Sequence, residues 1–322
     1  MARRPDPGGL EGVLIVAKTP GPTSHDVVAL VRRLTGTRRI GHGGTLDPFA
    51  SGVLPLFLGG ATRLVEYHLG DRKGYRATIC FGSSSTTDDL DGELTPVPGP
   101  LLDADTVRLV LERFRGEISQ RPPAYSAIQV GGRRAYALAR EGNALDLPER
   151  AVTIHDLELT AWNSDEPARP LAVIDVACSA GTYVRALARD LGEALGTGAY
   201  LGALTRTSSG PFALADAVTL DALRAAAAIG PGAVGGLLLP PDAGLEAIPA
   251  VRLTATEVAD AAMGRFVRPE HGLADLPPDM PIRLQDAEGR IVGMGRIVAR
   301  RIAPEKMLKG VNARPVEAGL DG

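Results

Sequence analysis

Residues 41–52 of this 322-residue chain read GHGGTLDPFASG, and this glycine-rich loop constrains the fold more than any other segment. It holds four glycines and one proline in twelve residues. Because glycine permits backbone angles and close approaches that other residues forbid, the segment predicts a shaped loop. Asp47 precedes Pro48, which favours an extended backbone and presents the carboxylate from a rigid turn. We expect a carboxylate used for chemistry; the alternative is an aspartate that only bonds its own turn.

Composition limits the class of protein. With 44% apolar residues, the chain can bury a sizeable core and form two domains. Cys80 and Cys178 each lie in an apolar run, which is typical of buried thiols in a reducing compartment. No run approaches the roughly 18 apolar residues of a membrane span, and the five histidines are widely separated. The sequence predicts a cytoplasmic protein without a membrane segment, a metal site or a cofactor.

The charge distribution is more informative than the net charge of −3. Basic residues crowd the segment before the glycine-rich loop and recur near the C-terminus, while acidic stretches such as residues 88–91 cancel the total elsewhere. These two groups either hold phosphates or form solvated faces. The first group is Arg32, Arg33, Arg38 and Arg39, and the second is Arg290, Arg296, Arg300, Arg301, Lys306, Lys309 and Arg314.

Hydrophobic periodicity predicts alternating strands and helices. Residues 12–17 and 53–58 are apolar runs of the strand type, and residues 75–82 alternate as a half-buried strand that Tyr75 opens. Helical spacing follows a cap at Thr23 or Ser24. A later helix is expected to be capped by Asp105 or Thr106. Residues 83–94 are polar and acidic and are expected to form a loop.

A second strong strand signal, residues 170–178, ends in a glycine turn that leads into a predicted helix. Arg185 lies in the first turn of that helix, where a positive charge opposes the helix dipole. This unfavourable placement indicates an anionic partner for Arg185; the alternative is a plain surface arginine. Residues 120–150 are basic and broken by glycines, which is typical of a mobile arm over a polyanion or of an ordinary surface insertion.

The glycine-rich loop resembles the catalytic loop of the TruB family, the bacterial tRNA pseudouridine-55 synthases, usually Gly-His-x-Gly-Thr-Leu-Asp-Pro. The resemblance covers most of residues 12 to 220. It implies an α/β (α+β) catalytic domain, residues 1–245, with a mixed, largely antiparallel sheet and a tRNA-gripping insertion at about residues 120–150. Residues 246–322, with a helix signal near Glu257 and strand-like runs at 282–284 and 291–298, resemble the β-rich, RNA-binding PUA-like domain of many such synthases.

The resemblance also implies a site. Asp47 matches the catalytic aspartate, Arg185 matches the arginine that contacts it, and Tyr75 matches the tyrosine that stacks on the target uracil. A guanidinium would hold the carboxylate ionised and oriented. His42 either occupies the space that the base vacates or bonds the loop backbone. The full set of positions matched to substrate or RNA contacts is Lys18, His42, Arg133, Arg134, Tyr183 and Leu204.

The implied reaction converts uridine 55 in the T loop of tRNA into pseudouridine. The base leaves its stack, its C–N glycosidic bond breaks, and the uracil turns and rejoins the same ribose through carbon. No group is added, so no cofactor is needed. Asp47 has three possible roles: attack on C1′, attack on C6 of uracil, or removal of a 2′ proton. The expected partner is the T arm of tRNA, and the expected state is a monomer without a protein partner.

Three alternatives remain at this stage. A guide-RNA-dependent synthase shares the glycine-rich loop and would need partner-binding surfaces. A non-catalytic tRNA-folding protein would use the basic segments and would not need Asp47. A glycosidase using Asp47 would need a second carboxylate as its acid, and no such residue is identifiable.

Overall fold

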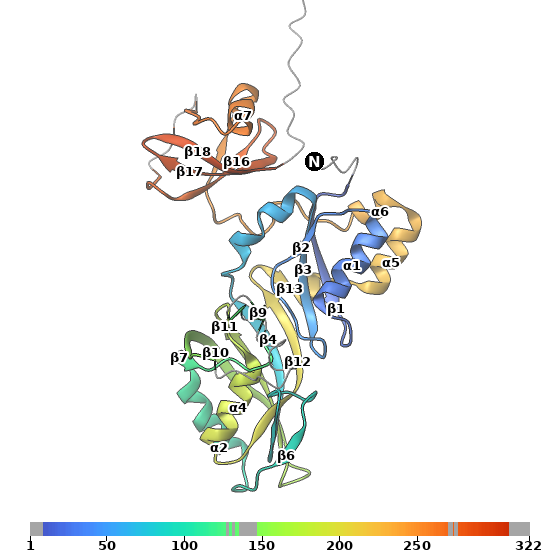
Figure 1. The fold of residues 1–322 in the computed structure, drawn as a ribbon, viewed down its shortest axis with the longest axis vertical. Coiled ribbons are helices and arrows are strands. Elements are labelled where there is room, and N and C mark those ends of the chain that lie inside the picture. Colours follow the sequence, from blue (N-terminus) through green and yellow to red (C-terminus); the bar gives the residue numbers. More distant parts are fainter. Residues whose placement is uncertain are drawn as a thin grey trace, which may run out of the picture.

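The computed structural model describes residues 9–126, 129–130, 133–134, 147–269, 273 and 276–308. The molecule is elongated, with a ten-stranded sheet through its lower two thirds and a separate four-stranded sheet at one end (Figure 1). The predicted α/β class, a mixed sheet plus a small C-terminal β-rich unit, is confirmed. In the part of the chain that is described, no helix is long and apolar enough to cross a membrane.

The large sheet is mixed and mostly antiparallel. Along its main path only the pairs β1–β14 and β3–β12 run parallel. Strands β2 (Ile40–His42) and β13 (Phe212–Ala213) attach beside this path, to β3 and β12. The path runs β14 (Val218–Thr219), β1 (Gly12–Lys18), β3 (Ser51–Leu58), β12 (Ala199–Ser209), β4 (Lys73–Phe81), β11 (Leu171–Cys178), β10 (Arg150–Asn163) and β7 (Gly116–Gln120).

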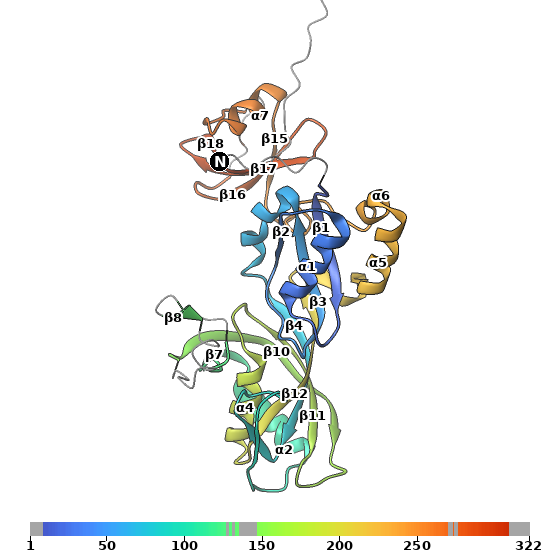
Figure 2. The same ribbon diagram turned by 45° about the vertical axis from the view of Figure 1, so that its right-hand side comes forward.

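Helices cover the two halves of this sheet separately. In Figure 2, α1 (Ser24–Thr35), α5 (Leu220–Ile229) and α6 (Pro231–Gly235) lie beside β1 and β3, whereas α2 (Ala104–Leu111) and α4 (Val184–Ala194) lie beside β10 and β11. The 3-10 turns are η1 (Gly59–Arg63), η2 (Val65–His68), η3 (Glu112–Phe114) and η4 (Leu214–Asp216).

The helix ends follow from side chains that satisfy free backbone N–H groups. The sequence offered Thr23 or Ser24 as the cap of α1. Thr23 is the cap, and it forms a reciprocal capping box with Asp26. The cap of α2 is Asp103, whose carboxylate accepts from the Thr106 N–H at 2.7 Å, so the expectation of Asp105 or Thr106 is wrong. Asp103 is the residue with an extended backbone, which lets its side chain turn back over the first turn.

Two apolar clusters hold the sheet to its helices. The predicted inner face of β4, from Ala77 to Phe81, packs with Leu187 and Leu191 of α4. Leu54 and Leu56 of β3 pack with Val27 and Val31 of α1. The glycine-rich loop lies between β2 and β3, so its ends are anchored in a rigid, buried frame.

Residues 83–94 are not simply a loop. Strand β5 (Ser83–Ser85) pairs with β6 (Leu94–Pro96), and the turn between them carries the acidic run at 88–91. Three consecutive serines followed by a polar segment give no strand periodicity, which is why the hairpin was missed. In the expected arm, β8 (Gln129–Val130) pairs with β9 (Arg133–Arg134); the side chains of these strands, and most of residues 127–146, lie outside the described residues.

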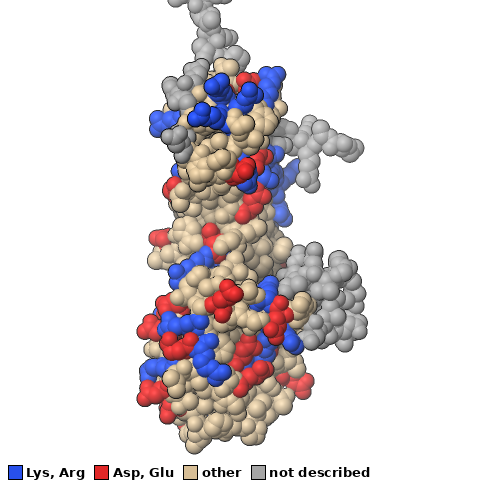
Figure 3. Space-filling model, turned by 90° about the vertical axis from the view of Figure 1, so that its left-hand side faces the viewer, with Lys and Arg blue, Asp and Glu red and all other residues tan. Residues whose placement is uncertain are grey.

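The small sheet has the order β15 (Ala250–Arg252), β16 (Pro281–Gln285), β17 (Ile291–Val298) and β18 (Arg301–Met307), with α7 (Ala255–Ala262) beside it. Basic side chains gather on this end of the molecule, at the top of Figure 3. Several of them are ion-paired: Arg290 with Asp286 and Glu288, Arg296 with Glu305, and Lys306 with Glu66. Several side chains of the C-terminal basic group are therefore already paired with carboxylates, and they are less available to bind phosphates than the sequence suggested.

Candidate active site

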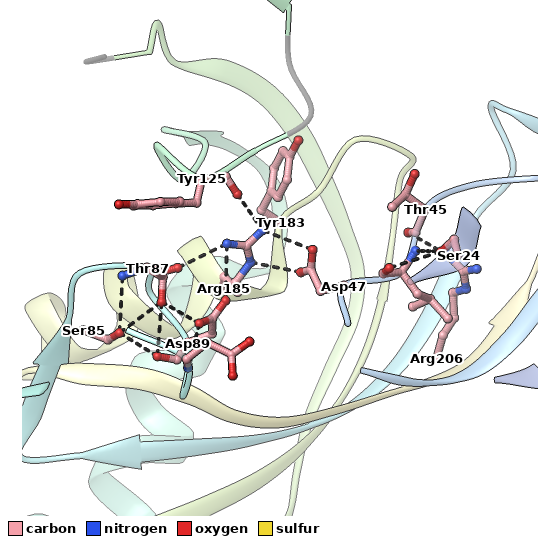
Figure 4. A network of polar contacts seen from close by, with 12 residues as sticks. Ser24, Thr45, Asp47, Ser85, Thr87, Asp89, Tyr125, Tyr183, Arg185 and Arg206 are labelled. Atoms are coloured by element: carbon pink, nitrogen blue, oxygen red, sulfur yellow. Dashed lines mark hydrogen bonds and ion pairs between the residues drawn. The ribbon is translucent and has the colours of Figure 1, made fainter. Parts of the chain in front are cut away.

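Asp47 and Arg185, 138 residues apart in sequence, meet at the centre of the large sheet (Figure 4). Arg185 Nε lies 3.0 Å from Asp47 Oδ2, and Arg185 Nη2 donates to Asp47 Oδ1 at 3.3 Å. The Arg185 side chain is 6% exposed, whereas that of Asp47 is 33% exposed. The guanidinium thus lies behind the carboxylate, which keeps one side open to a ligand.

Arg185 also connects this pair to the β5–β6 turn. Its Nη1 lies 3.4 Å from Asp89 Oδ2 and donates to the Thr87 carbonyl at 3.2 Å, while Nη2 donates to the Tyr125 carbonyl at 3.0 Å. Burial raises the pKa of Asp47; the Arg185 charge opposes that effect, and the Asp89 charge adds to it. The expected influence of Arg185 on Asp47 is present, but burial outweighs it.

Two side chains hold the backbone of the glycine-rich loop from below. Lys18 Nζ donates to the carbonyl oxygens of Asp47, Pro48 and Ala50 at 3.2, 3.1 and 2.6 Å. Ser24 Oγ accepts from the Leu46 N–H at 2.9 Å. Lys18 is only 2% exposed, and burial lowers its pKa to about 8. The structure therefore places Lys18 beneath the loop, facing backbone oxygens.

Tyr75 and Leu204 come from the neighbouring strands β4 and β12. Leu204 pairs with Ala77 and is 8% exposed, and two residues further along β12 Arg206 pairs with Tyr75. Tyr75 and Arg206 are therefore cross-strand neighbours. Burial raises the pKa of Tyr75, which favours the neutral phenol, and the Arg206 charge acts to lower that pKa. This strand pair brings both predicted residues to the site and adds Arg206.

His42 precedes Asp47 in the glycine-rich loop, and Tyr183 lies two residues before Arg185, at the start of α4. The Gly44 N–H donates to His42 Nδ1 at 3.3 Å, and burial lowers the pKa of His42. A neutral imidazole with its hydrogen on Nε2 fits this contact. The Tyr183 ring lies 4.8 Å from the guanidinium carbon of Arg150, and its backbone N–H and carbonyl both bond the Gln120 amide. His42 thus makes the loop-backbone contact considered from sequence.

Three neighbours of the site were missed from sequence: Asp89, Gln120 and Arg206. Asp89 lies in an acidic run interpreted as surface charge. Arg206 did carry a signal, because it is a charge at the end of the apolar run 199–204. Within the described residues, no group of His, Cys, Asp and Glu side chains is arranged to hold a metal ion.

The site residues other than Lys18 and Ser24 fall within matches to two family models. The model of the N-terminal domain of TruB family pseudouridylate synthases matches residues 32–184, and that of the tRNA pseudouridylate synthase B C-terminal domain matches residues 185–246. The chain belongs to the TruB family. Asp47 falls in the first match, and Arg185 and Leu204 fall in the second; the two matches together cover every strand of the large sheet except β1.

Curated relatives resemble the TruB-family chain over nearly its whole length. Proteins named tRNA pseudouridine synthase B are 45% identical in Synechococcus sp. (strain WH7803), covering 88% of this chain and 92% of that protein, and 43% identical in Acaryochloris marina, covering 92% and 98%. Among solved structures, an archaeal box H/ACA sRNP Nop10-Cbf5 complex gives a TM-score of 0.70 at 25% identity, and the match covers 97% of this chain and 91% of that chain. A Cbf5-Nop10-Gar1 complex gives a TM-score of 0.67 at 27% identity, and the match covers 92% of this chain and 84% of that chain.

Proposed function

We propose that this TruB-family synthase converts uridine 55 in the T loop of tRNA into pseudouridine, acting without a guide RNA. One observation carries the proposal: a partly exposed Asp47 carboxylate held from behind by the buried Arg185 guanidinium. Relatives named tRNA pseudouridine synthase B, at 39–47% identity, support tRNA as the substrate. The reaction needs only positioned protein groups, because the uracil is rearranged on its own ribose.

The residues around Asp47 suit a flipped-out uridine. Tyr75 offers a ring for stacking, Leu204 closes the apolar side, and His42 lies at the start of the glycine-rich loop. In the net reaction the C1′–N1 bond breaks, a C1′–C5 bond forms, the proton of C5 is lost and N1 gains a proton. Asp47 starts this sequence by attack on C1′, attack on C6 or removal of a 2′ proton.

The rest of the chain supplies RNA contacts in this proposal. Residues 1–245 form the catalytic domain, whose insertion at about 120–150 grips the T arm through Arg133 and Arg134. Residues 246–322 form a PUA-like domain that binds phosphates by charge, with affinity that falls as salt rises. Tyr183, which Arg150 and Gln120 hold in place, contacts the substrate in this proposal. The protein acts as a monomer in the cytoplasm, where tRNA is modified.

A guide-dependent synthase is the second candidate, favoured by one observation. The chain superposes on Cbf5 in two complexes that contain Nop10, one of which also contains Gar1. A synthase of that kind would not modify tRNA when it is given alone. The test below therefore omits every other RNA and protein.

The experiment incubates the full chain with an unmodified tRNA transcript and maps pseudouridine at single-nucleotide resolution. Asp47→Asn is compared with wild type and with Asp105→Asn, a matched change at a side chain that is 92% exposed. We expect product at position 55 with wild type and Asp105→Asn, and none with Asp47→Asn. Binding without product in all three would favour the guide-dependent candidate or a tRNA-folding protein, and full activity of Asp47→Asn would refute the role of this carboxylate.

A further inference from the structure

Arg206 is a buried cation at the centre of the site. It is 1% exposed and is the largest fully buried side chain among the described residues. Its guanidinium donates from Nε to the Val53 carbonyl at 2.7 Å, from Nη2 to Gly44 at 3.2 Å and from Nη1 to Thr45 at 3.4 Å. Within the described residues it forms no ion pair with a carboxylate. Burying a charged group without a counter-charge is unfavourable. The value of this guanidinium to the fold therefore lies in the hydrogen bonds that it donates.

Strand pairing places Arg206 between the two parts of the site. It pairs in parallel with Gly52 of β3, where the glycine-rich loop ends, and antiparallel with Tyr75 of β4. The register of β12 against β4 shifts directly after Arg206, an irregularity common beside active sites. Arg206 thus donates to the loop carbonyls from a position opposite Tyr75. In the view of Figure 4, Arg206 and Arg185 lie on opposite sides of Asp47.

We propose that Arg206 is a positioning residue for the synthase reaction, which holds the loop that carries Asp47 against the strand pair that carries Tyr75. The inference rests on the proposed function, in which Asp47 and Tyr75 contact the uridine. The guanidinium donates to the loop carbonyls, and the residue lies opposite Tyr75 on the neighbouring strand. Arg206 thereby sets the position of the Tyr75 ring relative to Asp47.

A lysine cannot replace these contacts. Lys18 shows the alternative geometry: a single nitrogen gathers carbonyls of one short segment, Asp47, Pro48 and Ala50. Arg206 uses three nitrogens in a rigid plane to reach both the start of the loop and the strand after it. Arg206→Lys keeps the positive charge but cannot bond these separate segments at the same time. The variant therefore separates the effect of the charge from the effect of positioning.

The test measures single-turnover rate constants with saturating full-length enzyme on a tRNA transcript, together with the dissociation constant for tRNA. Arg206→Lys, Arg206→Gln, Tyr75→Phe and the double variant Tyr75→Phe/Arg206→Lys are compared. Arg283→Lys is the control, because Arg283 also bonds two carbonyls and a carboxylate, but in the small sheet. The rate constant of the bound complex does not depend on how much enzyme is unfolded, so loss of stability is separated from loss of positioning.

We expect Arg206→Lys and Arg206→Gln to slow the reaction by roughly 10- to 100-fold, the scale for slight misplacement of reacting groups, with unchanged tRNA binding. Arg283→Lys should keep the wild-type rate constant. In the double variant the effects should not multiply, because both changes alter the same pair of neighbouring residues. A wild-type rate constant for Arg206→Lys and Arg206→Gln, or effects that multiply, would overturn the inference. Inactive wild type would instead count against the proposed function.

Discussion

Replacing Gly52 by alanine tests whether the close approach of β3 to β12 holds the site together. Gly52 has φ +111, and a Cβ there would overlap the Arg206 carbonyl oxygen and lie 2.5 Å from its nitrogen and 2.8 Å from its carbonyl carbon. These are backbone atoms of a paired strand, so they cannot move aside without separating β12 from β3. Gly52→Ala therefore combines backbone strain with a steric overlap.

Gly21 offers a matched control. Its φ is +106, and a Cβ there meets no atom of the described residues within 4 Å. A side chain in this sparsely populated backbone region costs about 1–3 kcal/mol at either position. Overpacking adds about 1–3 kcal/mol at Gly52 alone. We expect Gly52→Ala to lower the free energy of unfolding by about 2–6 kcal/mol and Gly21→Ala by about 1–3 kcal/mol.

Urea unfolding followed by circular dichroism measures both losses, and single-turnover kinetics measures the site. Gly52→Ala should also slow the reaction, because it displaces the backbone of Arg206, whereas Gly21→Ala should slow it less. Equal losses of stability in the two variants would mean that β3 and β12 can move apart at little cost in free energy. That result would refute the argument that the packing of this strand pair fixes the glycine-rich loop.

Three further predictions concern charge and packing. With the pKa of Lys18 at about 8, below its ordinary 10.5, the unfolded chain binds more protons between these pH values, so this group's contribution to stability rises with pH there. Over the same range the loop loses a charged donor, so single-turnover rates should fall above about pH 8, and Lys18→Arg should remove that fall. Asp89→Asn removes a charge that raises the pKa of Asp47, so the acidic limb of the pH–rate profile should move to lower pH; an unmoved limb would contradict the coupling through Arg185. Leu191→Ala, at a fully buried position of α4, should lower the free energy of unfolding by about 2–5 kcal/mol in urea titrations.

Local patterns predicted those elements whose side chains repeat with a clear period. Strands β1, β3, β4 and β11 and helices α1 and α4 all lie where apolar spacing indicated them. Strands β10 and β12 and the β5–β6 hairpin were not anticipated, because polar or small residues interrupt their alternation. β12 is nevertheless the strand that joins the two halves of the large sheet. Its place depends on pairing with β3 and β4, which no local window of sequence contains.

The glycine-rich loop could be recognised because all its residues are adjacent in the sequence. The first-turn position of Arg185 indicated an anionic partner, and the resemblance to the TruB family implied that this partner is Asp47; the two do meet, at 3.0 Å. Asp89 lacked such a signal. It stands in a run of aspartates that is typical of solvent-exposed loops, yet its side chain is 7% exposed, and it bonds Thr87 at 2.5 Å.

The three basic side chains at the site differ in what lies opposite them, and this difference separates their roles. Arg185 faces two carboxylates, so it balances charge beside the open face of Asp47. Lys18 and Arg206 donate to backbone carbonyls, which have no net charge, so their main role is to hold the loop; the Lys18 charge adds a smaller lowering effect on the pKa of Asp47. A site that must keep Asp47 available as a reacting group needs that division: one cation tunes the carboxylate, and the other two fix the backbone that carries it.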